Sequence, residues 1–313
     1  MGDQLTILDN FSSGTVTNVR NIEALSQNIQ LIKGDCKNPQ NVKKALSGVR
    51  IVYHFAGDPE VKPDRSDSSS WFYENIFATH VLLEQLKNFN VEKIVFASSS
   101  TVYGDAKLLP TPESYGPLVP ISVYGASKLA AEGLISAYCH SHSINAVILR
   151  FANIVGRKNK HGVISDFLKQ IQNKPRKFRI LGDGTQTKSF LHIDDCISAI
   201  LDATQNAKQS IDIFNVGSDD RLDVATIARI ALEEAGLDGT KSIFSQMASD
   251  GRGWNGDVKN MLLDTSKLRS TGWRPRHTSE QAVRSVIRSL LDGNNNEGPH
   301  MRSLHKKREL VSA

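Results

Sequence analysis

The chain has 313 residues, enough for one large domain or two unequal lobes, and its 39% hydrophobic and 23% charged residues are typical of soluble globular proteins. It contains no apolar run of about 18 residues and no signal peptide, so we expect a cytoplasmic protein that does not contact a membrane. The net charge of +5 lies largely in the basic C-terminal tail, which argues against nucleic acid as a partner.

The cysteines do not indicate a metal site or a disulfide. Cys36, Cys139 and Cys196 are far apart in the sequence and form no Cys-x-x-Cys pair. Metal and disulfide roles usually require closely spaced pairs, so we interpret all three as buried structural thiols and expect no bound metal.

In the first half of the chain, short β-branched runs alternate with helical stretches. We expect strands at 5–8, 29–32, 51–55, 94–97 and 146–149, and helices at 39–47, 70–89 and 123–142. Asn38 and Pro39 are typical of a helix N-cap and first helical position. The alternation predicts an α/β fold, a Rossmann-type doubly wound parallel sheet, in which ligands bind at the carboxyl ends of the strands.

From about residue 151 the loops lengthen and short apolar segments mix with helices. The apolar segments lie at 179–181, 190–193 and 213–216, and the helices at 163–173, 194–206, 223–236 and 279–292. We therefore expect a sheet domain at 1–150, a smaller α/β lobe at 151–292 and a polar, disordered tail at 293–313.

Tyr124 and Lys128 form the pair with the clearest chemical meaning. They are four residues apart at a helix start, so both side chains lie on one face. An ammonium group one turn away stabilises a phenolate and lowers the pKa of the tyrosine towards neutral pH, where it can act as a base. The pair follows a strand that ends in Ser98, Ser99 and Ser100. The alternative is a chance pairing of an aromatic residue with a solvated lysine.

Several further motifs together resemble one known family. They are Asp9-Asn10-Phe11-Ser12-Ser13-Gly14, Gly34-Asp35, His54-Phe55-Ala56-Gly57, Asn75, Ser98-Ser99-Ser100-Thr101-Val102-Tyr103-Gly104, Arg150-Phe151-Ala152-Asn153 and Gly272-Trp273-Arg274-Pro275. From residue 5 to about residue 291 the chain resembles the extended short-chain dehydrogenase/reductase family of NAD-dependent nucleotide-sugar epimerases and dehydratases. Members similar to UDP-glucose 4-epimerase resemble it most.

The resemblance implies a role for each matching residue. The catalytic residues would be Ser99, Tyr124 and Lys128. The residues that bind NAD would be Asp9, Asn10, Ser13, Gly14, Asp35, Cys36, Phe55, Ala56, Gly57, Asn75, Tyr124 and Lys128. Those that bind the nucleotide sugar would be Ser99, Thr101, Asn153, Lys188 and Arg252. No arginine follows Asp9 to hold a 2′-phosphate, which favours NAD over NADP.

Simpler interpretations of these residues stay open. Asp9 and Asp35 could only cap turns, and Ser99 could only cap the end of its strand. Lys188 and Arg252 could be solvated loop charges instead of cations that hold the two phosphates.

The residues after Ser99 bear on the reaction. Dehydratases of the family usually carry an Asp-Glu pair there, whereas this chain has Ser100 and Thr101, which favours 4-epimerisation by transient hydride transfer to NAD. The alternatives are a dehydratase, decarboxylase or reductase of the same family, or a non-catalytic nucleotide-sugar-binding protein. Family members also imply a homodimer through the helices at 70–89 and 123–142, where Ala126, Ala130 and Ala131 would permit close approach.

The chain departs from the family at its beginning. The family starts with a strand, a Gly-x-x-Gly-x-x-Gly turn and a helix, and no such turn occurs in this sequence. The absent strand would be central in the sheet, so its loss would leave backbone groups unpaired on both sides. Either Met1 is an internal or misassigned start, or the chain is truncated and binds NAD weakly.

Overall fold

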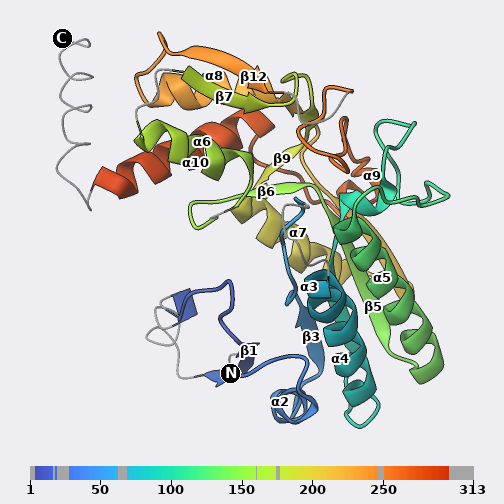
Figure 1. Cartoon of the computed structure of the whole chain (residues 1–313). Helices are drawn as coiled ribbons and strands as arrows, with labels where there is room; N and C mark the ends of the chain where they lie inside the picture. The colour runs from blue at the N-terminus through green and yellow to red at the C-terminus, as the bar shows by residue number, and fades with distance from the viewer. Residues whose placement is uncertain are drawn as a thin grey trace. The chain divides into compact units, whose positions relative to one another are not determined.

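The computed structural model describes residues 4–16, 18–19, 28–62, 69–159, 161–173, 177–245 and 250–295 (Figure 1). The chain divides into two compact units. Unit 1 comprises Met1–Ser98, Val123–Leu149 and Ala207–Ile213, and unit 2 comprises Ser99–Ser122, Arg150–Asn206 and Phe214–Ala313. The domain boundaries expected from the sequence are simpler than this division and stay a prediction.

The described strands of the parallel sheet are those predicted for the first domain together with one from further along the chain. They are β1 (Leu5–Asp9), β2 (Ile29–Lys33), β3 (Ile51–His54), β4 (Lys93–Ser99), β5 (Asn145–Phe151) and β10 (Ile211–Val216). In the described residues they form two separate pieces, a parallel pair β1–β2 and a four-stranded sheet in the order β10-β5-β4-β3. The α/β class with a parallel sheet is confirmed.

One strand contains residues of both units. The segment 213–216, expected in the second lobe, is part of β10, which pairs with β5 at the edge of the four-stranded sheet; Ile213 belongs to unit 1 and Phe214 onward to unit 2. Ile211 and Ile213 pack against the core of unit 1. A short apolar run can form the edge strand of the main sheet or a strand of the second lobe. Its length and composition therefore did not show which strand it pairs with.

Three helical stretches pack in unit 1. They are α2 (Pro39–Ala45), the continuous run α3 (Ser69–Trp71), η1 (Phe72–Phe77) and α4 (Ala78–Leu86), and α5 (Val123–His142). Asn38 caps α2 by accepting a hydrogen bond from the Gln40 backbone N–H at 2.9 Å, with Pro39 at the first position, as the sequence predicted. The segment η1 is a π-helix in place of the regular α-helix that the sequence indicated. α4 and α5 lie side by side (Figure 1).

Unit 2 is built from short strand pairs covered by helices. The strands are β6 (Asn153–Val155), β7 (Lys177–Leu181), β8 (Thr187–Lys188), β9 (Phe190–His192), β11 (Leu222–Asp223) and β12 (Lys241–Ser245). β6 pairs with β9, β7 with β12 and β8 with β11. The helices are η2 (Ser100–Tyr103), α6 (Gly162–Gln172), α7 (Ile193–Asn206), α8 (Val224–Glu234), α9 (Ser266–Arg269) and α10 (Ser279–Asn295).

The core of unit 2 forms where α6, α8 and α10 pack together. Phe167 of α6 and Phe178 of β7 lie in it with ring centroids 4.9 Å apart. α10 reaches Asn295, three residues into the segment expected to be disordered, and the rest of that tail lies outside the described residues. No helix in the described part of the chain is long and apolar enough to cross a membrane.

Candidate functional site

The carboxyl ends of β1 and β2 bring Asp9, Asn10 and Asp35 together. The Asp9 carboxylate accepts a hydrogen bond from the Phe11 backbone N–H at 2.6 Å, which shapes the turn after β1. The Asn10 side chain donates to Asp35 Oδ2 at 3.2 Å. The two strands are parallel neighbours, so their carboxyl ends lie at one edge of the sheet. Asn10 and Asp35, both predicted to bind the cofactor, are therefore in direct contact.

A lysine that the sequence did not single out completes this cluster. Lys37 donates its backbone N–H to Asp35 Oδ1 at 2.8 Å, and its ammonium lies 3.3 Å from Asp35 Oδ2 and contacts Glu74. Partial burial acts to raise the pKa of Asp35, but the hydrogen bonds from Lys37 and Asn10 lower it below its usual value. Asp35 therefore stays ionised at neutral pH, as a ligand for hydroxyl or amino donors requires.

The other predicted residues of this edge differ in exposure. Ser13 and Gly14 are exposed, and a Cβ placed on Gly14 would lie 3.4 Å from Asp9 Oδ2. Cys36 is half-buried, and burial together with Asp35 and Asp9 raises the pKa of its thiol to about 11. The thiol is therefore protonated at neutral pH and is no nucleophile.

Gly57 and Asn75 are packed so closely that no larger residue fits at position 57. A Cβ at Gly57 would lie 2.6 Å from Asn75 Oδ1 and 3.5 Å from Lys128 Nζ. Asn75 is 2% exposed and accepts a hydrogen bond from the Asp58 backbone N–H at 2.7 Å. Its amide donates to Ser127 Oγ at 2.9 Å. Asn75 thus connects the loop after β3 to α5, at Ser127, the residue before Lys128.

Phe55 and Ala56, which precede this glycine, are exposed. The side chain of Phe55 is 46% exposed and meets the Tyr53 ring edge-on, with the centroids 5.8 Å apart. Before them, His54 is buried, and its Nε2 lies 2.8 Å from Thr79 Oγ1. Burial first, and the nearby Lys128 charge second, lower the pKa of His54 to about 3.

Lys128 holds a buried ammonium group beside the Tyr124 ring. The residue is 6% exposed, and its Nζ donates to the Ala97 carbonyl of β4 at 3.0 Å. The Nζ lies 5.8 Å from the centroid of the Tyr124 ring and 5.2 Å from that of Phe96. Burial lowers the pKa of Lys128 to about 8. The structure therefore brings the predicted pair together, with the lysine close to its point of deprotonation.

Ser99 and Thr101 lie together at the start of unit 2. Ser99 is 8% exposed and caps η2, accepting hydrogen bonds from the Thr101 backbone N–H at 3.2 Å and from Thr101 Oγ1 at 2.9 Å. At the other end of η2, Tyr103 donates to Asn215 Oδ1 at 2.7 Å and accepts from Arg150 at 3.0 Å. The segment that carries Ser99 is thus anchored at both ends.

The two predicted phosphate-binding cations meet in one ionic network of unit 2. Lys188 Nζ lies 2.6 Å from Asp257 Oδ1, and the Asp257 side chain is 5% exposed. Arg252 donates to the Asp257 carbonyl at 2.7 Å and to both carboxylate oxygens of Asp105 at 3.0 and 2.7 Å. The sequence analysis did not identify Asp105 or Asp257, because each is far from its partner along the chain.

The same network contains more carboxylates than cations. Asp250 contacts Arg252, and Lys259 Nζ lies 3.1 Å from Asp183. The hydrogen bonds that Arg252 donates to the Asp105 and Asp250 carboxylates raise the pKa of Arg252 above its usual value. Both predicted cations are therefore neutralised within unit 2, and an incoming diphosphate would have to replace carboxylate partners.

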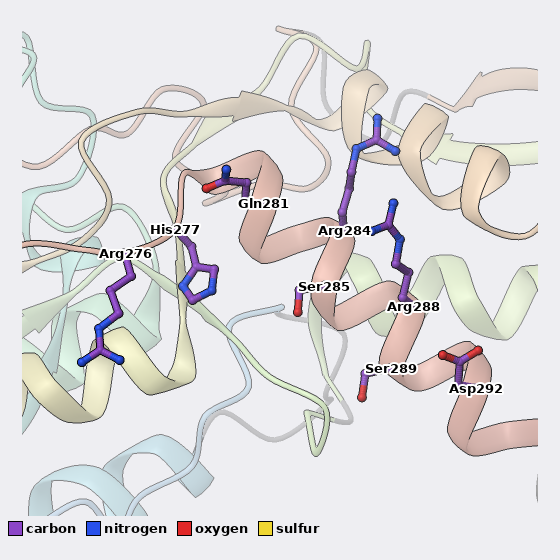
Figure 2. A pocket seen from close by; sticks show the side chains of 8 residues that line it. All are labelled: Arg276, His277, Gln281, Arg284, Ser285, Arg288, Ser289 and Asp292. Atoms are coloured by element: carbon purple, nitrogen blue, oxygen red, sulfur yellow. The ribbon is translucent and has the colours of Figure 1, made fainter.

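Asn153, the remaining predicted substrate residue, begins β6 and is half-buried. A pocket of about 670 Å³ elsewhere in unit 2 contains none of the predicted residues (Figure 2). It is lined by Arg276, His277, Gln281, Arg284, Ser285, Arg288, Ser289 and Asp292. Arg284 and Arg288 are bound to Glu234 of α8, at 3.0 and 2.8 Å, so these two arginines connect helices. The described residues contain no cluster of side chains suited to a metal ion.

The chain is similar to known proteins over most of its length. The profile of the NAD dependent epimerase/dehydratase family matches residues 2–217. The chain belongs to this family. It is 31% identical over 296 residues to a putative UDP-glucose 4-epimerase of Methanocaldococcus jannaschii, covering 92% of this chain and 90% of that protein. It is also 27% identical to the human dTDP-D-glucose 4,6-dehydratase, covering 86% of this chain and 77% of the human one.

A solved structure of the family agrees in fold. The UDP-glucuronic acid 4-epimerase of Bacillus cereus, in complex with UDP-glucuronic acid and NAD, is 28% identical, with a TM-score of 0.81 over 92% of this chain and 91% of that one. Both epimerases and dehydratases thus match, which shows a family of nucleotide-sugar epimerases and dehydratases with NAD as its cofactor.

The described residues fit the two ends of an NAD molecule. Asp9 and Asp35 are carboxylates at adjacent strand ends, suited to hydroxyl and amino donors, and Gly57 lets the backbone after β3 pass close to Asn75 and Lys128. The pyrophosphate between these ends is usually held by backbone amides of a glycine-rich turn at a helix N-terminus. No strand of the described residues leads into such a turn.

Proposed function

We propose that this family member is a nucleotide-sugar 4-epimerase that acts on a UDP-hexose. Bound NAD would supply the reversible oxidation of the sugar's C4 hydroxyl. The observation that carries the choice among family reactions is the segment after Ser99. Ser100 and Thr101 offer only hydroxyls, and removal of water requires an acid.

Tyr124 is the proposed base. An ordinary tyrosine, with a pKa near 10, is almost fully protonated at neutral pH. The Lys128 ammonium lies 5.8 Å from the centre of the Tyr124 ring in a site with little water, where its charge favours the phenolate strongly. Tyr124 would take the proton of the C4 hydroxyl and return it after the sugar has turned over.

Lys128 and Ser99 have supporting roles in this proposal. The Lys128 ammonium carries three protons and gives one to the Ala97 carbonyl, so it can also donate to a ribose hydroxyl. Ser99 Oγ accepts from Thr101, and its own proton can be directed to the C4 oxygen. Asn153, Lys188 and Arg252 would bind the nucleotide diphosphate.

The test is interconversion of UDP-glucose and UDP-galactose by the purified chain with NAD, followed by chromatography of the sugars. We expect 4-epimer formation that Tyr124→Phe lowers by about 10²–10⁴-fold. A net change in NADH absorbance would favour a reductase or decarboxylase instead. The proposal is wrong if a folded chain that binds both ligands forms no 4-epimer from any UDP-hexose.

A second candidate is a protein that binds nucleotide sugars without turning them over. The strands described in unit 1 favour it, because they form two separate pieces and none of them leads into a glycine-rich turn of the kind that usually holds the pyrophosphate of NAD. Thermal stabilisation by a UDP-sugar but not by NAD would support this candidate, whereas stabilisation by both would favour the enzyme.

We also propose a homodimer formed through η1, α4 and α5. Phe72 and Tyr73 of η1 are 52% and 50% exposed, which is unusual for adjacent aromatic residues on a monomer surface. Ala126 and Ala130 are exposed on α5 and permit close approach, whereas Ala131 is buried in the core and takes no part. Light scattering should give twice the chain mass, and Tyr73→Glu should give a monomer.

A further inference from the structure

Almost every N–H of the Arg252 guanidinium is already hydrogen-bonded within unit 2. Its Nη1 and Nη2 donate to the two carboxylate oxygens of Asp105 at 3.0 and 2.7 Å, which makes a bidentate pair. Nη1 also donates to the Asp257 carbonyl at 2.7 Å, and Nε donates to Asp250. Among the described residues, these bonds leave a single N–H, on Nη2, without a partner. A phosphate group can therefore take two N–H groups of Arg252 only by displacing a carboxylate.

The carboxylates around Arg252 differ in how readily they can leave. The Asp257 side chain is 5% exposed and is held by Lys188 Nζ at 2.6 Å. The Asp105 side chain is 43% exposed, and Arg252 is its only recorded partner in the described part of the chain. Asp250 is also exposed, but it belongs to the same loop as Arg252 and accepts from the Arg252 backbone N–H at 3.3 Å as well. Asp105 is therefore the partner that an incoming anion displaces most readily.

The loop that carries Arg252 is fixed by bonds that do not involve Asp105. The Gly251 carbonyl accepts from the Asp183 backbone N–H at 2.9 Å. Lys259 Nζ donates to the carbonyl that precedes Gly251 at 2.9 Å and lies 3.1 Å from the Asp183 carboxylate. Departure of the Asp105 carboxylate should therefore free one edge of the guanidinium without unfolding the loop.

Asp105 itself is presented by a tight turn. It follows Gly104, whose N–H donates to the Thr101 carbonyl at 3.2 Å at the end of η2. Gly104 has φ at +61°, and a Cβ there would lie 1.9 Å from the Val119 carbonyl oxygen, so the backbone conformation requires glycine. The Asp105 carboxylate therefore stays within reach of Arg252 when its side chain turns away.

The charge of the network opposes the addition of a second anion. Its described members are the carboxylates Asp105, Asp183, Asp250 and Asp257 and the cations Lys188, Arg252 and Lys259. Carboxylates are already in excess, and several of these groups are partly buried, where salt screens charges less than in water. Rotation of the Asp105 side chain into solvent would remove one negative charge from contact as a phosphate arrives.

We propose that Asp105 is an internal competitor of the diphosphate, bound to Arg252 in the free protein and displaced by a phosphate group of the nucleotide. Carboxylate and phosphate both bind a guanidinium through two oxygens, so they exclude one another on this edge of Arg252. Asp105 thereby weakens the binding of nucleoside diphosphates and favours their release. The inference rests on the proposed role of Arg252 in binding the diphosphate, and it adds the residue that sets the affinity.

Calorimetric titration of the full chain with UDP measures this competition. Asp105→Asn removes the charge and one of the two competing oxygens, so it should bind UDP about 3–10-fold more tightly than the wild type. Glu280→Gln is the matched control. Arg284 also has three carboxylate partners, and Glu280, which is 45% exposed and 2.8 Å away, is one of them. The control removes the same charge elsewhere in unit 2 and should leave the UDP affinity unchanged.

Asp250→Asn distinguishes the two exposed carboxylates and should increase the affinity less than Asp105→Asn. The proposal is overturned if Asp105→Asn binds UDP no more tightly than the wild type, or if Asp250→Asn or Glu280→Gln gives an equal gain. It is also overturned if neither the wild type nor Asp105→Asn binds UDP. The titrations involve no turnover, so a chain that shows the gain but forms no 4-epimer contradicts the proposed reaction and supports the competition.

Discussion

At the scale of single residues, the site depends on the ammonium charge of Lys128, which burial destabilises. Lys128 is nearly buried, and among the described residues its ammonium has one recorded hydrogen bond, to a carbonyl that carries no negative charge. Burial without a carboxylate partner destabilises the charged form, which is why the pKa of Lys128 falls to about 8. A lysine in this state can support a neighbouring phenolate and also respond to pH within the working range.

The first prediction concerns the alkaline limb of the activity. Because the pKa of Lys128 is about 8, the ammonium is present below that pH and is lost above it. We expect kcat/KM for the 4-epimerase reaction to fall as the pH rises past about 8, approaching tenfold per pH unit. The measurement is a pH profile of the purified protein with NAD.

Lys128→Arg provides the control for this profile. Arginine stays charged throughout the range, so the variant should be slower but should lose the decline above pH 8. If wild type and variant share the same alkaline limb, Lys128 is not the group that titrates.

A second residue-scale prediction concerns the contact between Gly57 and Asn75. Gly57→Ala would place a Cβ 2.6 Å from Asn75 Oδ1, so the Asn75 side chain would have to move. That movement would break its bonds to Asp58 and Ser127. Gly57→Ala should therefore lower the free energy of unfolding. We expect this loss to be about 1–2 kcal/mol smaller in an Asn75→Ala background than in the wild type.

The measurement is a double-mutant cycle by denaturant unfolding. Gly239→Ala serves as the uncoupled control, because a Cβ there meets no atom within 4 Å. Strict additivity of Gly57→Ala and Asn75→Ala would contradict the predicted contact.

At the scale of elements, the helices that are determined by neighbouring residues could be predicted from the sequence. The Asn38–Pro39 cap gave the start of α2, and the helix expected at 123–142 has the same bounds as α5. The π-helix η1 was not predicted, and the partners of its Asn75 are Asp58 and Ser127, 17 and 52 positions away, which no local pattern connects. The short strands β6, β8, β11 and β12 likewise depend on distant partners.

The candidate site shows the same division. Tyr124 and Lys128 are four residues apart on one helix, so their proximity follows from helical geometry. The partners of Lys188 and Arg252 are Asp257 and Asp105, 69 and 147 positions away. No local pattern connects them, so the sequence identified the cations but not the carboxylates that neutralise them.

A prediction at this scale compares two glycines. Gly104 ends η2 with φ at +61°, and a Cβ there would lie 1.9 Å from the Val119 carbonyl oxygen. Gly104→Ala should therefore lower the Tm strongly, at a cost of about 3 kcal/mol or more. Gly133 lies within α5, where a Cβ meets nothing within 4 Å. Gly133→Ala should raise the stability by about 0.5–1 kcal/mol.

Thermal unfolding of both variants gives the answer. An unchanged Tm for Gly104→Ala would contradict the close approach to Val119. A loss for Gly133→Ala would show that the outer face of α5 is occupied, for instance by a second subunit.

At the scale of the whole molecule, the α/β fold followed from the alternation of strands and helices, and the family followed from motifs spread along the chain, several of which lie at the ends of predicted strands. The division into units did not follow. Ser99–Ser122 and Ala207–Ile213 belong to units other than those of their sequence neighbours, and only tertiary packing decides this. The described strands of unit 1 form two separate pieces, β1–β2 and β10-β5-β4-β3.

The last prediction concerns how the stability of the chain depends on pH. His54 is buried and neutral, and its pKa falls from the usual 6.5 to about 3. Below pH 6.5 the unfolded chain takes up a proton that the folded chain refuses until about pH 3, so folding loses free energy as the pH falls through this window. Above pH 6.5 the residue contributes no pH dependence. We expect a loss of about 1.4 kcal/mol per pH unit from His54 between these limits.

Urea unfolding at several pH values measures this slope. His54→Gln keeps a side chain that can hydrogen-bond to Thr79 but cannot titrate, so it should flatten the decline between pH 6.5 and about 4.5. His140→Gln is the matched control, because His140 is exposed on α5. If His54→Gln and His140→Gln leave the same slope as the wild type, His54 is protonated in the folded chain without penalty, and the core around Thr79 admits water.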